Sequence, residues 1–367
     1  MDVKRIIGIF LLLFSWSFFG CFGHKDLFVP VDDVHIQYEG RFFSPDSTRL
    51  RLDYPGTRIR LSYDGTDAFI KLKPSAGYFS VSVDGGDPFK FNSASCGEDG
   101  LFRLASGLER GKHTVEVTLV SEGLFDQPEF FGFLLDGDAE LLTLPAKKHR
   151  MEFIGNSITC GYGVEAANED EKFNDSTSNF VKSYAALTAK AFDAEMMVVA
   201  RSGIGAYRNF DDKPEGSLRP MPVVYENILI SGERTQWDFS RFTPDVLCVN
   251  LGTNDLSTTG CRLDLLENAY RNFISRIRAN YPATKIVLLS GCMVRPGEGL
   301  EELRTILDRI AGDFKKAGDE NIFRFDFTPH DGSLGYGADW HPSAGQQQKM
   351  SFELIPFLSS ITGWKVE

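Results

Sequence analysis

FIGNSITCGYG, residues 153–163, places a serine at a tight turn where an apolar segment ends. Residues 151–154 have the apolar character of a short buried strand, and Gly155 and Asn156 allow a sharp backbone turn directly after it. The turn places Ser157 at the carboxyl end of the strand, which is where ligands bind in an open α/β sheet. We therefore take Ser157 as a candidate nucleophile at the edge of a parallel sheet.

Three further motifs follow in order, at or beyond the ends of apolar runs. ARSGIG (200–205) follows MMVVA (196–200), GTND (252–255) follows VLCVNL (246–251), and DWHP stands at 339–342. Continuous apolar runs of this length are typical of central parallel strands, so we expect the polar motifs to meet at one sheet edge.

Acyl transfer needs a nucleophile, a base and hydrogen-bond donors directed at the oxyanion. Ser157 and His341 are the candidate nucleophile and base, and the Gly205 backbone N–H and the Asn254 side-chain amide are the candidate oxyanion donors. Asp255, taken by itself, is interpreted as a helix N-cap.

With these motifs in this order, the chain resembles the SGNH (GDSL-like) serine hydrolases, whose four name-giving residues match Ser157, Gly205, Asn254 and His341. FIGNSITCGYG, ARSGIGAYRN and ADWHPS, together with a β-rich N-terminal half, look most like carbohydrate esterase family 2. The resemblance implies removal of acetyl groups from plant-wall polysaccharides of the xylan or glucomannan type through an acetyl-serine intermediate. We expect no cofactor, and no metal site, because the six histidines are scattered without partners at ligand spacing.

The sequence departs from the superfamily pattern beside the histidine. The usual carboxylate partner stands three residues before it, and that residue is Ala338 here. Either Asp339 orients His341, or a backbone carbonyl fixes its tautomer and leaves a Ser–His dyad. In related esterases an aromatic near the histidine packs against the sugar, which makes Trp340 a candidate for substrate binding; the alternative is a core tryptophan. Weaker candidates for the lining of the cleft are Tyr162, Tyr207, Arg208 and Arg295.

The two halves of the chain differ in periodicity. Residues 32–144 form short alternating segments, such as 58–63, 78–83 and 114–120, which predict a jelly-roll-like β-sandwich over 26–145 whose aromatics either fill the core or bind sugar. Beyond it, helical periodicity at 178–192, 263–278, 300–314 and 344–358 alternates with strands at 196–200, 246–251, 285–290 and 322–327. This order predicts an α/β domain over 149–365, with a parallel sheet flanked by helices, and the resemblance implies that it is the hydrolase domain.

The first 21 residues have the shape of a secretory signal. Lys4 and Arg5 precede an apolar run from 6 to 19, and Gly20-Cys21 closes it as in a lipoprotein signal. We expect an exported bacterial protein, lipidated at Cys21 in the periplasm or outer membrane, or else secreted or held by an uncleaved anchor. Membrane association is expected only through this segment.

Composition narrows the possible partners. The 367 residues are 42% apolar and 13% aromatic, enough for two cores, and the net charge of −12 argues against nucleic acid. Apart from Cys21, five cysteines without CxxC spacing indicate neither a disulfide framework nor a zinc site, and Cys160 is interpreted as a packing residue. Two alternatives stay open: a different short-chain or lipid-like acyl ester as substrate, or a catalytically impaired glycan-binding surface protein.

Overall fold

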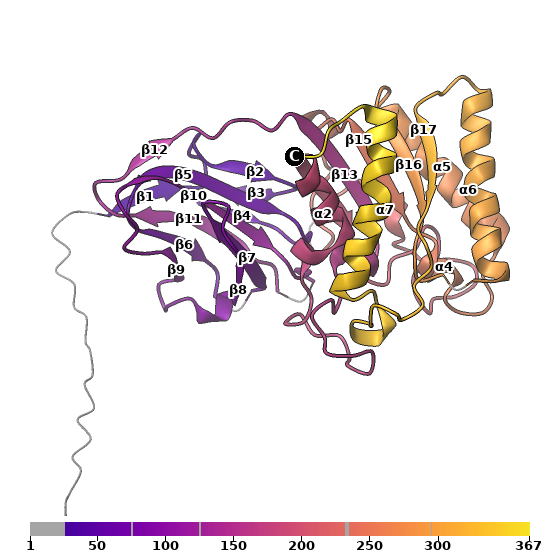
Figure 1. The fold of residues 1–367 in the computed structure, drawn as a ribbon, viewed down its shortest axis with the longest axis horizontal. Helices are drawn as coiled ribbons and strands as arrows, with labels where there is room; N and C mark the ends of the chain where they lie inside the picture. Colours follow the sequence, from indigo (N-terminus) through magenta and orange to yellow (C-terminus); the bar gives the residue numbers. More distant parts are fainter. Residues whose placement is uncertain (1–25, 75, 125, 232–234, 295) are drawn as a thin grey trace, which may run out of the picture.

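The computed structural model describes residues 26–74, 76–124, 126–231, 235–294 and 296–367. The predicted signal segment with Cys21, and Arg295, lie outside the described residues. An all-β domain and an α/β domain lie side by side along the long axis of the molecule (Figure 1). Within the described part of the chain, no helix has both the length and the apolarity needed to span a membrane.

The N-terminal domain is a sandwich of two antiparallel sheets, as predicted. One sheet has the order β3-β4-β11-β6-β9, with β1 paired to β11, and the other has the order β12-β5-β10-β7-β8, with β2 paired to β5. Most consecutive strands alternate between the sheets, as in a jelly roll. The first sheet contains β1 (Leu27–Pro30), β3 (Phe43–Asp46), β4 (Arg49–Arg51), β6 (Ala68–Leu72), β9 (Leu101–Ala105) and β11 (Glu129–Leu135); the second contains β2 (Gln37–Glu39), β5 (Arg58–Gly65), β7 (Tyr78–Val83), β8 (Phe89–Asn92), β10 (Gly111–Leu119) and β12 (Glu140–Leu142).

Apolar side chains, which alternate with polar ones along the strands, fill the space between the two sheets. Ile59 and Leu61 of β5 and Ile70 of β6 belong to one buried cluster, whereas Arg58 and Arg60 lie on the other side of β5. Among the aromatics considered as sugar platforms, Tyr54 and Tyr63 are fully buried. These two side chains therefore pack inside the protein and are not platforms for sugar.

The C-terminal domain contains a five-stranded parallel sheet in the order β14-β13-β15-β16-β17. Its strands are β13 (His149–Gly155), β14 (Ala194–Ala200), β15 (Val246–Asn250), β16 (Lys285–Ser290) and β17 (Ile322–Asp326). α5 (Leu263–Asn280) and α6 (Glu298–Lys316) pack on one face of the sheet, and α2 (Tyr184–Ala191) and α7 (Ala344–Thr362) pack on the other (Figure 1). The predicted α/β domain with flanking helices is confirmed.

One predicted helix starts later than expected. The pattern at 178–192 indicated a single helix, but α2 begins at Tyr184 because the Ser183 side chain caps it by accepting a hydrogen bond from the Ala186 N–H. The preceding Phe180–Lys182 segment is a separate 3₁₀ turn.

The sheet register brings the sequence motifs together. Gly155 at the end of β13 pairs with Ala200 of β14 on one side and with Asn250 of β15 on the other. The loops that follow these three strands therefore leave the sheet at the same edge, as the parallel arrangement requires.

The two domains share a buried ion pair. Arg41 of the sandwich and Glu152 of β13 are both fully buried, with Nη2 and Oε1 3.6 Å apart. Arg41 also donates to the Asn227 carbonyl at 2.8 Å, and its guanidinium lies 5.0 Å from the ring centre of Tyr225 and 4.9 Å from that of Trp237. Because neither charge reaches water, each depends on the other domain for its compensation.

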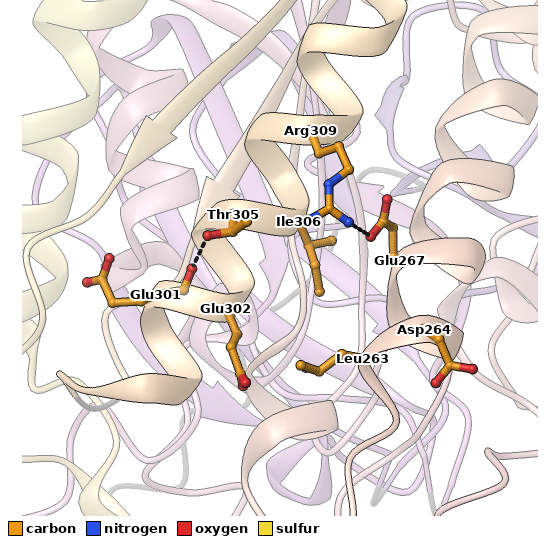
Figure 2. A pocket seen from close by; sticks show the side chains of 8 residues that line it. All are labelled: Leu263, Asp264, Glu267, Glu301, Glu302, Thr305, Ile306 and Arg309. Atoms are coloured by element: carbon orange, nitrogen blue, oxygen red, sulfur yellow. Dashed lines mark hydrogen bonds and ion pairs between the residues drawn. The ribbon is translucent and has the colours of Figure 1, made fainter.

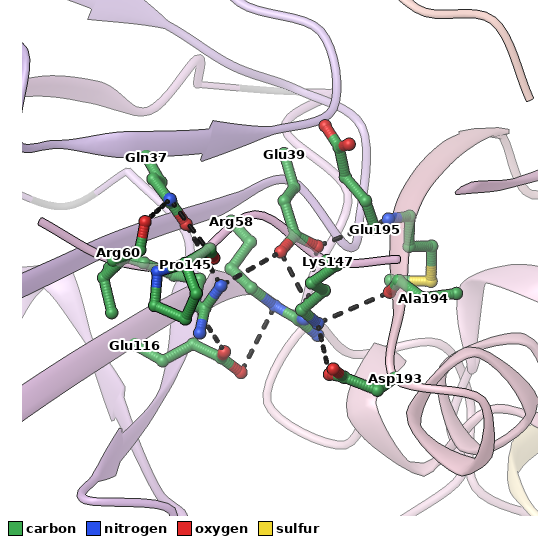
Figure 3. Close-up of polar contacts among 12 residues, drawn as sticks. Gln37, Glu39, Arg58, Arg60, Glu116, Pro145, Lys147, Asp193, Ala194 and Glu195 are labelled. Carbon is green, nitrogen blue, oxygen red and sulfur yellow. Dashed lines mark hydrogen bonds and ion pairs between the residues drawn. The ribbon is translucent and has the colours of Figure 1, made fainter. Parts of the chain in front are cut away.

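A second polar group joins the domains near the linker between them (Figure 3). Glu39 of β2 is nearly buried and faces Arg58 Nη1 at 3.3 Å and Lys147 Nζ at 3.6 Å. Lys147 also lies 3.8 Å from Asp193 and donates to the Ala194 carbonyl, directly at the start of β14. Lys147, in the linker itself, thus joins Glu39 of the sandwich to Asp193 and Ala194 of the C-terminal domain.

Candidate active site

Ser157 is the first residue of the short helix α1 (Ser157–Cys160), directly after β13. The Asn156 side chain caps this helix by accepting from the Ile158 N–H at 3.0 Å. Gly155 is required for space, since a Cβ atom there would lie 2.0 Å from Thr159 Oγ1. The Ser157 N–H belongs to the first helical turn, whose amides have no intrahelical acceptor, so it can donate to a ligand.

His341 lies within hydrogen-bond distance of Ser157. Its Nε2 is 2.9 Å from Ser157 Oγ, and its Nδ1 lies 3.0 Å from the Ala338 carbonyl oxygen and 3.2 Å from that of Asp339. A carbonyl oxygen can only accept, so Nδ1 carries the proton and Nε2 is free to receive one from the serine. Burial lowers the pKa of His341 to about 4, against the smaller opposing effects of the two carbonyls and the Asp339 charge, so the imidazole is neutral at pH 7.

Of the two alternatives for the orientation of His341, the structure has the backbone carbonyls at Nδ1 and not the Asp339 carboxylate. The carboxylate accepts from the Tyr162 hydroxyl at 2.6 Å and pairs with Lys172 Nζ at 2.9 Å. Asp339 and Trp340 have φ angles of 48° and 63°, an uncommon left-handed conformation for residues with side chains. This turn places the carbonyls of Ala338 and Asp339 at Nδ1 in place of a side chain.

Tyr162, a weaker candidate from the sequence, packs against the base. Its ring stacks on the His341 imidazole with the centres 4.0 Å apart and the planes 26° apart. The same residue thus contacts the ring of His341 and holds the carboxylate of Asp339 through its hydroxyl.

Both predicted oxyanion donors lie in the loops that leave this sheet edge. Asn254 is on α4 (Thr253–Leu256), is nearly buried, and uses one amide hydrogen to bind the Ile204 carbonyl at 2.7 Å, which leaves the second available. The Gly205 N–H donates to Asn209 Oδ1 at 3.1 Å. A Cβ at Gly205 would lie 1.9 Å from the Arg208 carbonyl oxygen, so only glycine fits there. Asn209 was not identified from the sequence.

Asp255 is not a helix N-cap as expected. It lies inside α4, and its buried carboxylate accepts from the backbone N–H groups of Ala206, Tyr207 and Arg208, each at 2.9 Å. The Arg208 side chain is fully buried and donates to the Thr258 and Thr259 carbonyls, so the prediction that it lines the cleft is wrong. These contacts fasten the segment after Gly205 to the segment after β15.

Exposed aromatic rings stand next to the catalytic loops. Trp340 is 53% exposed beside His341, with the Tyr336 ring 5.1 Å away, which rules out a core role. Phe210 is 58% exposed, and its N–H donates to the Gly203 carbonyl at 2.8 Å. Phe210 was missed because nothing in the sequence separates an exposed phenylalanine from a core one. Tyr207, by contrast, is buried.

Other groups on the hydrolase domain do not add to this site. Cys160 is buried and burial raises its thiol pKa, which keeps it protonated. A hollow of about 520 Å³ between α5 and α6 is lined by Glu267, Glu301, Glu302 and Arg309, among others, and by none of the catalytic residues (Figure 2). Over the residues that the structure covers, no three His, Cys, Asp or Glu side chains are placed to hold a metal ion.

A neutral histidine in contact with a serine hydroxyl, at the carboxyl ends of a parallel sheet, defines a serine hydrolase. Comparison with known proteins agrees: residues 153–349 match the GDSL-like lipase/acylhydrolase family and residues 38–145 match the carbohydrate esterase 2 N-terminal domain. The chain belongs to the GDSL-like serine hydrolases, and among them to carbohydrate esterase family 2. It is therefore a carboxylic ester hydrolase that acts as a carbohydrate esterase.

Three relatives show the extent of the similarity. A family two carbohydrate esterase from Clostridium thermocellum, solved in complex with cellohexaose, is 34% identical with a TM-score of 0.82 over 90% of this chain and 99% of that one. The cellulase/esterase CelE of Acetivibrio thermocellus is 34% identical over 91% of this chain, which spans only 40% of CelE. An acetylxylan esterase/glucomannan deacetylase of Cellvibrio japonicus is 26% identical over 99% of this chain and its own full length.

Proposed function

We propose that this chain removes O-acetyl groups from plant-wall polysaccharides of the xylan or glucomannan type, through an acetyl-serine intermediate. The observation that carries the proposal is the 2.9 Å contact between His341 Nε2 and Ser157 Oγ, with Nδ1 held on backbone carbonyls. Support for the substrate comes from the Cellvibrio japonicus relative named acetylxylan esterase/glucomannan deacetylase and from the Clostridium thermocellum esterase solved with cellohexaose.

Each half of the reaction uses the same groups. His341 Nε2 takes the Ser157 proton as Oγ bonds to the acetyl carbonyl carbon, and the carbonyl electron pair moves to the oxygen. The Ser157 N–H and the free Asn254 amide hydrogen stabilise this oxyanion, whereas the Gly205 N–H, the third predicted donor, is bound to Asn209 Oδ1. The oxyanion collapses, the bond to the sugar oxygen breaks, and the imidazolium returns its proton to that oxygen. Water then hydrolyses the acetyl-serine with His341 again as base.

The surface around the serine suits a hydroxylated substrate. Trp340 and Phe210 offer exposed ring faces of the kind that stack on sugars. The segment at 165–178 is polar and acidic, which disfavours a lipid chain as the acyl or alcohol part. These features favour the polysaccharide over other short-chain or lipid-like acyl esters.

The alternative of an impaired glycan-binding protein predicts a broken catalytic pair. In this structure the serine, the histidine and the hydrogen bond between them are all present. Purified protein tested on acetylated xylan, acetylated glucomannan and p-nitrophenyl acetate separates the candidates. Acetate from the polysaccharides supports the proposal, hydrolysis of the small ester alone assigns another ester substrate, and inactivity on all three supports the binding protein.

We also propose export and lipidation at Cys21, from the sequence of the first 21 residues alone. Mass spectrometry of the mature N-terminus tests this directly. A diacylglyceryl-modified Cys21 as first residue supports it, and an unmodified first residue elsewhere contradicts it.

A further inference from the structure

Glu122 is a carboxylate of the sandwich domain that lies against a catalytic loop of the other domain. It follows β10, is only 6% exposed, and accepts from the Ser202 N–H at 2.8 Å with one oxygen. Its second oxygen accepts from the Ser202 hydroxyl. Ser202 lies in the loop that runs from β14 to Gly205, so a residue of the N-terminal domain reaches the loop carrying a predicted oxyanion donor.

This loop, residues 201–205, is held at both of its ends. Glu122 binds it near its start, and Asp255 binds the three amides that follow Gly205. Between these attachments, Gly203 has a φ of 76° and open space where a side chain would be, with only the Phe210 Cβ at 3.9 Å. Glycine in such a position imposes little conformational restraint of its own, so the loop depends on its contacts to keep one shape.

The same loop connects to the oxyanion donors. The carbonyl of Ile204 accepts from the Asn254 amide at 2.7 Å, which sets the direction of the second amide hydrogen. Gly205 supplies the backbone N–H on the next residue. A shift of the loop at Ser202 therefore moves the Ile204 carbonyl, and with it the Asn254 amide, relative to the serine, and misplacements near 1 Å can cost about 100-fold in rate.

We propose that Glu122 is a positioning residue of the esterase, through which the β-sandwich holds loop 201–205 in the shape that stabilises the transition state. The expected effect on kcat rests on the proposed function, whereas the expected effect on the structure of loop 201–205 does not. It gives the sandwich a role in catalysis without any contact between the sandwich and the reacting atoms.

The chemistry of the contact supports a specific role. Burial raises the pKa of Glu122, whereas both hydrogen bonds from Ser202 lower it and so favour the ionised acceptor. Two donors on one residue match the two carboxylate oxygens, which is the arrangement that compensates a buried carboxylate. Removing the carboxylate leaves the Ser202 N–H and hydroxyl without these acceptors.

Asp53 provides a matched control. It is also a buried sandwich carboxylate bound to a loop of the hydrolase domain, but its partners are the Ile230 N–H at 3.1 Å and the Ser231 N–H and hydroxyl at 2.9 and 2.8 Å. Asp53→Ala therefore removes a similar interdomain contact without touching loop 201–205.

The experiment compares Glu122→Ala, Glu122→Gln and Asp53→Ala with the wild-type chain. We expect Glu122→Ala to lower kcat on p-nitrophenyl acetate about 10- to 100-fold with KM within about twofold. Glu122→Gln should recover part of the loss, because its amide oxygen still accepts from the Ser202 N–H. Asp53→Ala should lower Tm but leave kcat within about twofold.

Hydrogen exchange makes the test independent of substrate. Peptides covering 201–209 should exchange faster in Glu122→Ala than in Asp53→Ala at equal fractions of folded protein. Unchanged exchange in Glu122→Ala overturns the inference even if the wild-type chain proves inactive on every ester. Equal losses of kcat in the Glu122 and Asp53 alanine variants would also overturn it, since both would then act through overall stability.

Discussion

Asp339→Asn separates a Ser–His dyad from a triad that depends on a carboxylate. In a triad whose aspartate orients the histidine, removing that charge lowers kcat about 10⁴-fold, or about 5.5 kcal/mol. Here Nδ1 is bound by the carbonyls of Ala338 and Asp339 at 3.0 and 3.2 Å, and the substitution leaves both in place.

The expected loss comes from two smaller effects. The Asp339 charge stabilises the imidazolium that forms in the transition state, and its carboxylate accepts from the Tyr162 hydroxyl at 2.6 Å. An asparagine oxygen can keep that hydrogen bond but not the charge. We therefore expect kcat/KM to fall about 3- to 10-fold, or less than about 1.4 kcal/mol.

The assay is steady-state hydrolysis of p-nitrophenyl acetate by wild type, Asp339→Asn, Lys172→Ala and His341→Ala. Lys172 is 83% exposed, so breaking its ion pair with Asp339 should change the rate less than twofold. His341→Ala gives the level of activity without a base. If folded Asp339→Asn falls to that level, the backbone carbonyls do not suffice to orient His341, and the enzyme depends on the carboxylate.

Three further predictions concern the oxyanion, the base and the domain interface. Asn254→Ala should lower kcat about 10²- to 10³-fold with an unchanged circular dichroism spectrum, and near-normal turnover would remove Asn254 from the oxyanion hole. Because burial holds the pKa of His341 near 4, kcat/KM should stay level as pH falls through about 6.5, the ordinary histidine value. The stability that the neutral His341 contributes to the fold should decline as pH falls from about 6.5 to about 4. An acid limb near 6.5 in the pH–rate profile would contradict the low pKa. Glu152→Ala leaves Arg41 buried without its carboxylate and should lower the free energy of unfolding, measured in urea, by about 3–5 kcal/mol. The Arg41→Met/Glu152→Leu double variant should recover most of that free energy, because it leaves no buried charge. Equal losses in the two variants would contradict a role for the ion pair.

Sequence reasoning succeeded where chain order alone determines position. Apolar runs ending in polar motifs predicted β13, β14 and β15, and parallel pairing then required that Ser157 and the loops with Gly205 and Asn254 share one edge. The order of the motifs along the chain does not determine where the Asp339 side chain points. That direction follows from two consecutive left-handed residues, which sequence patterns predict only for glycine and, less often, asparagine or aspartate.

Contacts between segments far apart in the chain could not be predicted from the sequence either. Glu122 and Ser202 are 80 residues apart, and Arg41 meets Glu152 from the other domain. Nothing local distinguishes these charged residues from solvated ones, because their burial results from the packing of two completed domains. The full burial of Arg208 also depends on a distant segment, because its side chain donates to the Thr258 and Thr259 carbonyls of the same domain.

A rapid acid quench of the wild-type chain turning over acetylated glucomannan, followed by peptide mass spectrometry, detects the acetyl-serine intermediate itself. We expect an acetyl group on Ser157 in the quenched enzyme, with no acetylated peptide and no acetate release in Ser157→Ala. Acetate release by Ser157→Ala at the wild-type rate, or an acetyl group on another residue, would contradict it.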